Sequence, residues 1–217
     1  MPEDKLNKIL SELPPCVRLV AVSKFHPAGA IEELYRAGHR IFGESRPQEL
    51  MAKAEALPKD IEWHFIGHLQ TNKLKMVLPY VDMVESVDSL HLLQAIDKWG
   101  RENKQRVNIL LEVHIAREET KQGFLEEELP GILERDWEGV AICGLMGMAT
   151  NTSDESVIRS DFERIRDIKQ QLETHHPQIR ELSIGMSSDW KIALEYGATI
   201  VRIGTAIFGE RDYSAKK

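Results

Sequence analysis

Lys24 is the residue whose type and position most directly indicate chemistry. It ends an apolar stretch that begins at Val17 and stops before Phe25-His26-Pro27. A lysine at the end of a buried strand is poorly solvated, and partial burial favours the neutral amine. A neutral amine is a nucleophile that condenses with carbonyl groups. Because most lysines are solvated surface charges, this position indicates a function only if other functional groups gather near it.

Two turns near the end of the chain carry groups suited to phosphate. Gly204 and Thr205 follow a strand-like pattern and precede a predicted short helix. Backbone N–H groups at a helix start bind anions, and glycine lets a ligand approach the backbone. Ser187 and Ser188 follow Gly185 in a second turn of the same kind. Each hydroxyl is equally suited to capping a helix, but two such turns on neighbouring strands favour a phosphate site.

Four other polar side chains stand at or near predicted strand ends. Arg202 either adds positive charge to the phosphate site or pairs with an acidic side chain inside the fold. His68 follows a strand-end glycine and is a better ligand candidate than His64, which alternates with apolar residues and is expected to pack in the wall. Ser45 either reaches a ligand or caps the helix that Pro47 opens.

Strand-like and helical patterns alternate along the chain, which predicts an α/β fold with parallel strands. Strand-like patterns fall at 17–24, 40–44, 62–67, 82–87, 107–115, 139–147, 181–185 and 199–204. Helical patterns fall at 3–13, 28–37, 47–57, 90–103 and 156–175, and glycines at 38, 100 and 197 are expected to close helices. Eight such units predict a single (β/α)8 TIM-type barrel with an extra N-terminal helix, over residues 1–217. An open doubly wound sheet is the alternative, but the first turn lacks its GxGxxG signature.

In a barrel the carboxyl ends of the strands meet at one face, where the active sites of this fold lie. Lys24 and the two glycine–hydroxyl turns would therefore share that face. The sequence has no zinc-site spacing, no GxSxG elbow and no Walker loop. An amine beside a phosphate site predicts Schiff-base capture of a phosphorylated carbonyl compound, either pyridoxal 5′-phosphate (PLP) or a sugar phosphate.

Composition narrows the class of protein. The 217 residues are 42% apolar and 29% charged, as in ordinary globular proteins, and the net charge of -7 argues against binding to nucleic acid or to anionic membranes. No apolar run reaches the length of a membrane span. Cys16 and Cys143 form no metal or redox motif, and Cys143 is expected to be a buried free thiol. We therefore expect a cytoplasmic protein.

Six motifs, spread in order over nearly the whole chain, resemble one family. They are Ala21-Val-Ser-Lys24, Phe42-Gly-Glu-Ser45, Trp63-His-Phe-Ile-Gly-His-Leu-Gln-Thr-Asn-Lys73, Gly144-Leu-Met-Gly-Met148, Leu182-Ser-Ile-Gly-Met-Ser187 and Val201-Arg-Ile-Gly-Thr-Ala-Ile-Phe-Gly-Glu-Arg211. The chain is thereby similar to the pyridoxal phosphate homeostasis protein (YggS/PROSC) family. That resemblance implies a barrel like the alanine racemase N-terminal domain, a fold-type III PLP barrel, with PLP held as an internal aldimine.

The resemblance also implies roles for individual residues. Lys24 matches the aldimine lysine, and Arg202 matches an arginine near the cofactor. The phosphate ligands implied are Ser187, Gly204 and Thr205, and the residues around the ring are Ile66, His68, Met146 and Met186. One position departs from the family pattern, which usually reads Gly-Glu-Asn where this chain has Ser45. A serine reaches less far than asparagine and offers fewer hydrogen bonds, so this contact to PLP is expected to be lost, replaced or mediated by water.

The family is understood as a carrier and regulator of PLP without an established reaction. Alanine racemase completes its site with a second domain, and this chain ends soon after the last strand pattern, so we expect no catalytic residues. Because no residues have zinc-site spacing, we also expect no metal. The implied ligand is PLP, apo PLP-dependent enzymes are candidate recipients, and a monomer is expected, with a weak dimer as the alternative. Two other hypotheses are a small PLP-dependent enzyme such as a racemase, using His26 or His68, and a Schiff-base aldolase without cofactor.

Overall fold

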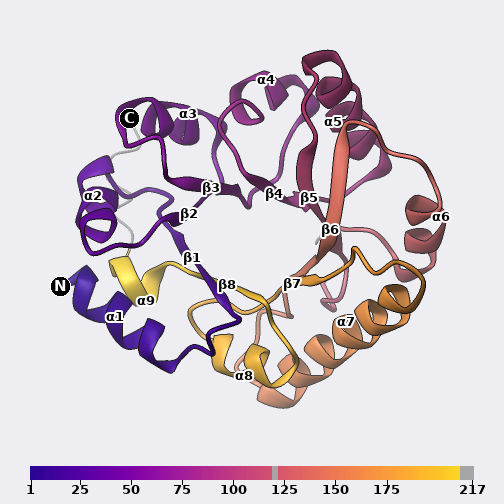
Figure 1. Ribbon diagram of the computed structural model, residues 1–217. Coiled ribbons are helices and arrows are strands. Elements are labelled where there is room, and N and C mark those ends of the chain that lie inside the picture. The colour runs from indigo at the N-terminus through magenta and orange to yellow at the C-terminus, as the bar shows by residue number, and fades with distance from the viewer. Residues whose placement is uncertain (119–121, 211–217) are drawn as a thin grey trace.

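The computed structural model describes residues 1–118 and 122–210, and within them eight parallel strands close into a barrel (Figure 1). The strands are β1 (Arg18–Val22), β2 (Ile41–Glu44), β3 (Glu62–Phe65), β4 (Met83–Val87), β5 (Val107–Val113), β6 (Val140–Gly147), β7 (Glu181–Ser183) and β8 (Ile200–Ile203). They follow one another in chain order, and β8 closes the ring by pairing with β1, with Arg18 opposite Ile200. The predicted barrel is confirmed, and the alternative of an open sheet is excluded.

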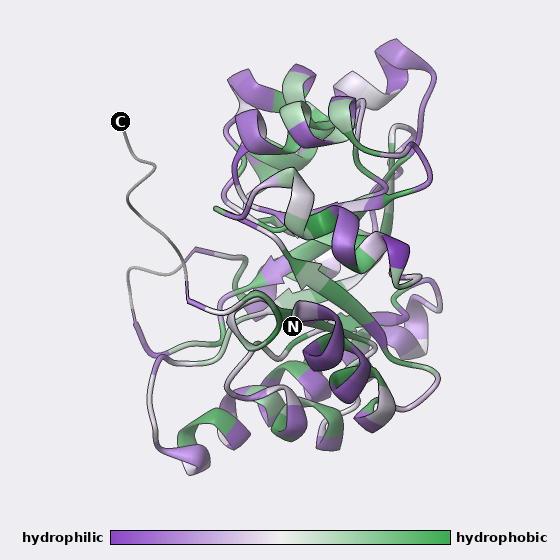
Figure 2. Ribbon diagram, turned by 90° about the vertical axis from the view of Figure 1, so that its left-hand side faces the viewer, coloured by the Kyte–Doolittle hydropathy of each residue, from purple (hydrophilic) through white to green (hydrophobic). Residues whose placement is uncertain are grey.

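The helices lie outside the ring of strands (Figure 1). They are α1 (Pro2–Glu12), α2 (Ala28–Arg36), α3 (Pro47–Ala56), α4 (Leu74–Val77), α5 (Leu90–Asn103), α6 (Leu129–Leu133), α7 (Glu155–His175), α8 (Trp190–Glu195) and α9 (Thr205–Phe208), with 3-10 turns at Thr71–Lys73 and Glu126–Glu128. The hydropathy colouring shows apolar strands enclosed by helices that carry polar segments (Figure 2). In the described part of the chain, no helix has the length and apolar character needed to cross a membrane.

Three predicted helix ends test the role of glycine. Gly38 and Gly197 follow α2 and α8 with φ angles of 97° and 80°, the left-handed conformation that glycine adopts without strain. The prediction for Gly100 is wrong, because it lies inside α5. A Cβ there would stand 2.2 Å from the carbonyl oxygen of Gly139, so glycine is needed for close packing. Lys104, with φ 54°, ends that helix instead.

The barrel interior is filled with side chains and is not a pore. An inner cluster of buried residues occupies it, with Ile66 packed against it: Val20, Val22, Met83, Leu110, Met146 and Ile200. Side chains alternate between the two faces of a strand, so Val20 and Val22 place every second residue of β1 inside. Continued past the end of β1, this alternation brings Lys24 to the same face, at the mouth of the barrel.

Candidate functional site

Lys24 lies just beyond the carboxyl end of β1, half-buried. The chain turns directly there, and the His26 N–H donates to the Ser23 carbonyl at 3.0 Å. Phe25 has a φ of 67°, a left-handed conformation that is unusual for a bulky side chain. The lysine is therefore held at the apex of a sharp turn above the inner cluster, as its position at a strand end predicts.

The turn between β8 and α9 lies beside the end of β1 and presents backbone donors. The Ser187 hydroxyl accepts from the N–H groups of Gly204 and Ala206, at 3.2 and 3.3 Å. Between them, the Thr205 N–H donates to no atom of the residues that the structure describes. A Cβ on Gly204 would stand 3.1 Å from the Val22 carbonyl oxygen, so this turn packs against β1 two residues before Lys24. The end of the lysine strand and the donor turn are thus neighbours, as predicted.

The turn after β7 directs Ser187 toward β8. Its Met186 N–H donates to the Asp189 carboxylate at 2.6 Å, which fixes the turn. Asp189, and neither of the two serines before it, is the N-cap residue of α8. The alternative in which Ser187 or Ser188 caps that helix is therefore wrong, and the Ser187 hydroxyl serves the β8 turn. Arg211, the last residue of the strand-8 motif, lies outside the described residues.

Arg202 points into the barrel beneath this face and is 4% exposed. One terminal nitrogen donates to the Ser183 hydroxyl at 2.5 Å and to the carbonyl of the same residue at 2.8 Å, and the other donates to the Gly147 carbonyl at 3.0 Å. The Glu85 carboxylate lies 3.7 Å away. Of the two alternatives for Arg202, the structure shows the pairing with an internal acidic side chain.

Glu85 is the centre of what we call the inner network, formed by His64, Glu85, Ser183 and Arg202. His64 Nδ1 and the Ser183 hydroxyl each contact a different Glu85 oxygen, both at 2.5 Å. Burial by itself would raise the pKa of the Glu85 carboxyl. The bonds and charges of its partners outweigh burial and hold that pKa below its ordinary value. The network therefore buries a carboxylate beneath the barrel mouth with both of its oxygens bonded.

The prediction for His64 is confirmed in its burial within the barrel, but its partner was missed. Glu85 stands in a strand, β4, whose residues are all buried. A single charged residue inside such an apolar run is the signal that could have found the network, because a buried charge requires a partner. No sequence spacing links it to Arg202, which lies more than a hundred residues away.

His68 lies at the rim, with its side chain 52% exposed. Its Nδ1 contacts the Asp88 carboxylate at 2.8 Å, which joins the ends of β3 and β4. The structure thus places His68 beside the barrel mouth, where it was predicted, and orients its ring through an acidic partner that the sequence did not indicate.

The remaining predicted residues line the same end of the barrel. Met146 belongs to the inner cluster below Lys24, and Ile66 packs against that cluster. Ser45 is half-buried, and its backbone packs so closely on the next strand end that a Cβ at Gly67 would stand 2.3 Å from the Ser45 carbonyl oxygen. The N-cap residue of α3 is Arg46, so the role of Ser45 as a helix cap is excluded.

A second cluster of polar side chains, which we call the outer network, lies outside the barrel wall between β1, β2 and α3. It consists of Ser23, Glu44, Glu49 and Lys53. The Lys53 ammonium donates to the Glu44 carboxylate at 2.6 Å and to the Ser23 carbonyl at 2.9 Å. Burial raises the pKa of Glu44, and this outweighs the effects of Lys53 and of the Ser23 hydroxyl, which donates at 2.7 Å.

The outer network was also missed from the sequence. Its signal is Lys53 on α3, which lies one helical turn from Leu50 and next to Ala54, all three of them buried. A lysine on the apolar face of a helix requires an acceptor there. This reasoning would have predicted a buried pair, but it would not have named the partners.

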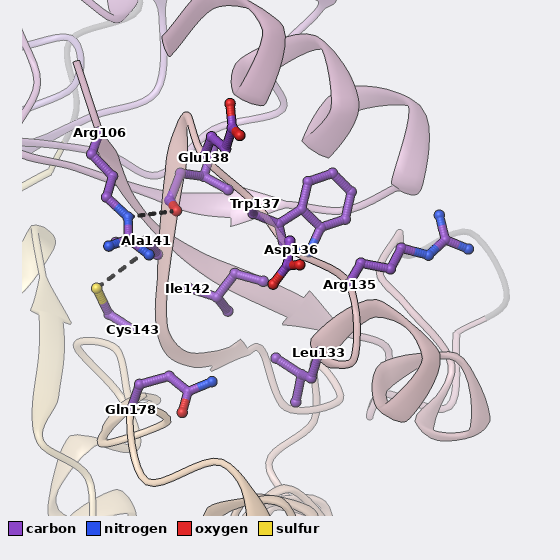
Figure 3. Close-up of a pocket in the computed structure, with 11 residues that line it drawn as sticks. Arg106, Leu133, Arg135, Asp136, Trp137, Glu138, Ala141, Ile142, Cys143 and Gln178 are labelled. Carbon is purple, nitrogen blue, oxygen red and sulfur yellow. Dashed lines mark hydrogen bonds between the residues drawn. The ribbon is translucent and has the colours of Figure 1, made fainter. Parts of the chain in front are cut away.

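The structure also contains a hollow of about 620 Å³ at the other end of the strands (Figure 3). It is lined by residues such as Arg106, Trp137, Val140 and Cys143. Arg106 and Val140 stand at the starts of β5 and β6, so this hollow is remote from Lys24. That end of a barrel serves stability and not chemistry. Cys143 is half-buried there, more accessible than predicted, and burial raises its pKa. No three metal-ligand side chains gather anywhere in the described part of the chain.

The fold and the site define a class of protein: (β/α)8 barrels with a lysine at the end of the first strand and a donor turn at the end of the last. A family model described as the N-terminal domain of alanine racemase matches residues 3–212. Among solved structures, alanine racemase of Clostridium difficile superposes with a TM-score of 0.82 at 12% identity, over 96% of this chain and 59% of that one. This likeness concerns the fold.

Closer relatives are similar over nearly their whole length. A pyridoxal phosphate homeostasis protein of Aquifex aeolicus is 40% identical over 202 residues, 91% of this chain and 89% of the relative. One from Vibrio alginolyticus is 39% identical, over 93% and 89%. PipY of Synechococcus elongatus, solved with PLP bound, is 38% identical with a TM-score of 0.87, over 96% of this chain and 100% of that one. The chain therefore belongs to the pyridoxal phosphate homeostasis proteins of the alanine racemase N-terminal domain family.

Proposed function

We propose that this protein binds PLP through Lys24 and takes part in intracellular PLP homeostasis, as a store or carrier of the cofactor. The observation that supports this most directly is the packing of the Gly204 turn on Val22, which sets phosphate donors beside the lysine strand. Membership of the homeostasis family and the PLP-bound structure of PipY agree with it.

The residues present fit the cofactor. PLP supplies an aldehyde, with which the Lys24 amine condenses reversibly. The Ser187 hydroxyl and the N–H groups of Gly204, Thr205 and Ala206 converge at a helix start, an arrangement suited to a phosphate. The Gly204 and Ala206 N–H groups, which donate to the Ser187 hydroxyl in this structure, would transfer their bonds to the phosphate. These groups would hold the phosphate and fix the distance from it to Lys24.

The ring of the cofactor would lie on an apolar surface. Ile66, half-buried and packed against the inner cluster above the buried Met146, would supply that surface, together with the half-buried Met186 of the turn after β7. Methionine and isoleucine pack against a flat ring without competing for its polar atoms. Arg202 remains below with its charge held by the inner network, and His68 and Ser45 stand at the rim.

We further propose that the protein holds and releases PLP without turning over a substrate. A proton donor for catalysis must reach the reacting atom in a fixed position. His26, close to Lys24 in the chain, and His68, at the rim of the barrel, both have partners. The His26 ring stacks on Phe208 at 4.9 Å between centroids, and His68 is bonded to Asp88. Release by water or by an incoming amine needs only a reversible bond at Lys24.

Absorbance of the purified protein with added PLP tests the binding proposal. The wild-type protein is expected to develop the band of a PLP–lysine adduct, which borohydride reduces and fixes at Lys24. Lys24→Ala should lose the band, whereas Lys75→Ala, a change of an exposed lysine on α4, should retain it. A Lys24→Ala protein with the wild-type band would refute the proposal. A colourless wild-type protein that cleaves aldols would favour the aldolase alternative.

Deuterium exchange at Cα of added amino acids tests the absence of catalysis. We expect no exchange above that of free PLP for a panel of common amino acids. Exchange by the loaded protein that disappears in His68→Ala or His26→Ala would favour the racemase alternative.

A further inference from the structure

The two peptide groups on either side of Lys24 are each bonded to a charged side chain of α3. The Ser23 carbonyl, before the lysine, accepts from the Lys53 ammonium at 2.9 Å. The Phe25 N–H, after the lysine, donates to the Glu49 carboxylate at 2.9 Å. The backbone of the turn is thus fastened at both ends by residues that lie outside the barrel wall, on the side away from its interior.

Glu49 and Lys53 also contact each other. The Lys53 ammonium lies 3.4 Å from Glu49 and 2.6 Å from Glu44. Its side chain is 9% exposed, so these charged contacts are shielded from bulk water. Such contacts are stronger in the protein interior than in water. The Ser23 hydroxyl completes the ring of contacts by donating to Glu44 at 2.7 Å. A displacement of either end of the turn would therefore break several charged bonds.

Glu49 also stabilises an unfavourable backbone conformation. Phe25 adopts a φ of 67°, which persists in a bulky residue only where its surroundings impose it. The Glu49 bond to its N–H supplies such a constraint. Arg46 supplies another, since its guanidinium lies 5.2 Å from the centre of the Phe25 ring and donates to Glu49 at 3.0 Å.

We propose that Glu49 and Lys53 are positioning residues for Lys24, which set the direction in which its amine projects into the barrel mouth. This inference rests on the proposed function. Neither residue would touch the cofactor: both act through the backbone of the turn, as supporting groups do when they limit the freedom of a reactive side chain. Lys53 is no second site for the aldehyde, because its ammonium is bonded to three oxygens in the outer network.

Three variants of α3 test this inference. Glu49→Ala removes the acceptor of the Phe25 N–H, Glu49→Gln retains an uncharged acceptor, and Glu55→Ala is the matched control. Glu55 lies on the same helix; its carboxylate accepts from Tyr80 at 2.8 Å and its carbonyl from Lys59 at 3.1 Å, and neither partner belongs to the Lys24 turn. The measurements are hydrogen exchange of the Phe25 and His26 amides without PLP, the Kd for PLP, the rate at which PLP is trapped on Lys24 by borohydride, and the melting temperature.

We expect Glu49→Ala to lose protection of the Phe25 amide, to bind PLP about tenfold more weakly and to be trapped more slowly. Glu49→Gln should lie between this variant and the wild type, and Glu55→Ala should match the wild type in exchange and Kd. A merely structural role would lower the melting temperature of Glu49→Ala and leave its Kd unchanged below that temperature, which would overturn the inference.

The failure of the inference and that of the proposed function are distinguishable. A wild-type protein that binds no PLP would refute both. A wild-type protein that binds PLP, together with a Glu49→Ala variant of equal Kd and lost amide protection, would refute only the positioning role.

Discussion

Two buried carboxylates stand on opposite faces of the barrel wall, and they differ in how their oxygens are bonded. Glu85 faces the interior, where His64 and Ser183 contact one oxygen each. Glu44 faces α3, where Lys53 and Ser23 both contact the same oxygen. The second oxygen of Glu44 is buried and has no hydrogen-bond partner among the described residues. The inner network is therefore saturated, and the outer one is not.

The two carboxyl groups also differ in the direction in which their pKa values are shifted. Burial opposes ionisation of both carboxyls. For Glu85 the partners outweigh burial and the pKa falls, whereas for Glu44 burial outweighs the partners and the pKa rises. Beside Glu44, therefore, one cation does not offset the effect of burial on the pKa, and one oxygen of that carboxyl has no donor among the described residues.

The two networks also serve different parts of the site. The inner network fixes Arg202 and forms the floor of the barrel mouth. The outer network fixes the turn that carries Lys24. In the inner network both oxygens of the carboxylate have partners, whereas in the outer network one oxygen of Glu44 has none among the described residues. We therefore expect mutations in the two networks to change the stability of the protein to different extents.

The largest expected effect is that of Glu85→Ala. It leaves Arg202 buried without its carboxylate, and loss of one partner from a buried ion pair costs about 3–5 kcal/mol. The free energy of unfolding, measured with urea, should fall by that amount. Glu163→Ala, which removes an exposed carboxylate from α7, is the control and should be close to wild type. A small effect of Glu85→Ala would show that the inner network does not stabilise the barrel.

Lys53→Met should have the next largest effect and a different pH dependence. At pH 7 it leaves Glu44 buried without its cation, at a cost of roughly 3 kcal/mol. The pKa of Glu44 is already raised, so the carboxyl takes up a proton as the pH falls and the cost should shrink by pH 5. Urea unfolding at both pH values measures this. An equal cost at both would contradict the raised pKa.

Two serine variants compare the networks directly. Ser183→Ala removes a hydroxyl that bridges Glu85 and Arg202, so both groups lose a partner, at a cost of about 2 kcal/mol. Ser23→Ala removes one donor from a Glu44 oxygen that keeps Lys53, at a cost of about 1 kcal/mol. Thermal unfolding of the matched pair should rank them in this order. A larger loss of stability in Ser23→Ala than in Ser183→Ala would contradict the difference in hydrogen bonding between the two networks.

The smallest expected effect is on the pH dependence of stability. Because the folded-state pKa of Glu85 is lowered from 4.5, its contribution is present above that value and is lost as the pH falls through the folded pKa. Because that of Glu44 is raised from 4.5, its contribution is present below that value and is lost as the pH rises through the folded pKa. Glu85→Gln should thus weaken the loss of stability in acid, and Glu44→Gln the loss above pH 4.5. Urea unfolding at pH values from 3 to 8 measures both effects. If the two variants changed the pH dependence of stability in the same direction, the assignment of one lowered and one raised pKa would be contradicted.

Much of the fold and part of the site could be predicted from the sequence. All eight strand patterns become strands, because hydrophobic runs between turn residues leave few alternatives. Lys24, Ser187 and Gly204 were predicted to meet because parallel strands end at one face. Gly100 is an exception, since a glycine needed for close packing and one needed for a turn look alike in sequence. The partners of Glu85 and Glu44 come from distant elements, and local patterns do not specify such pairs.

The sequence by itself determined the barrel, the lysine at the end of its first strand, the two glycine–hydroxyl turns and the resemblance to a PLP-binding family. These depend on residue type and on spacing along the chain. Only the tertiary structure decided that Arg202 is held inside by Glu85, that Ser187 serves the β8 turn, and that Glu49 and Lys53 fasten the backbone around Lys24. Those contacts depend on closure of the barrel and on the register of its strands, because a buried charge takes whichever partners the packed elements bring within reach.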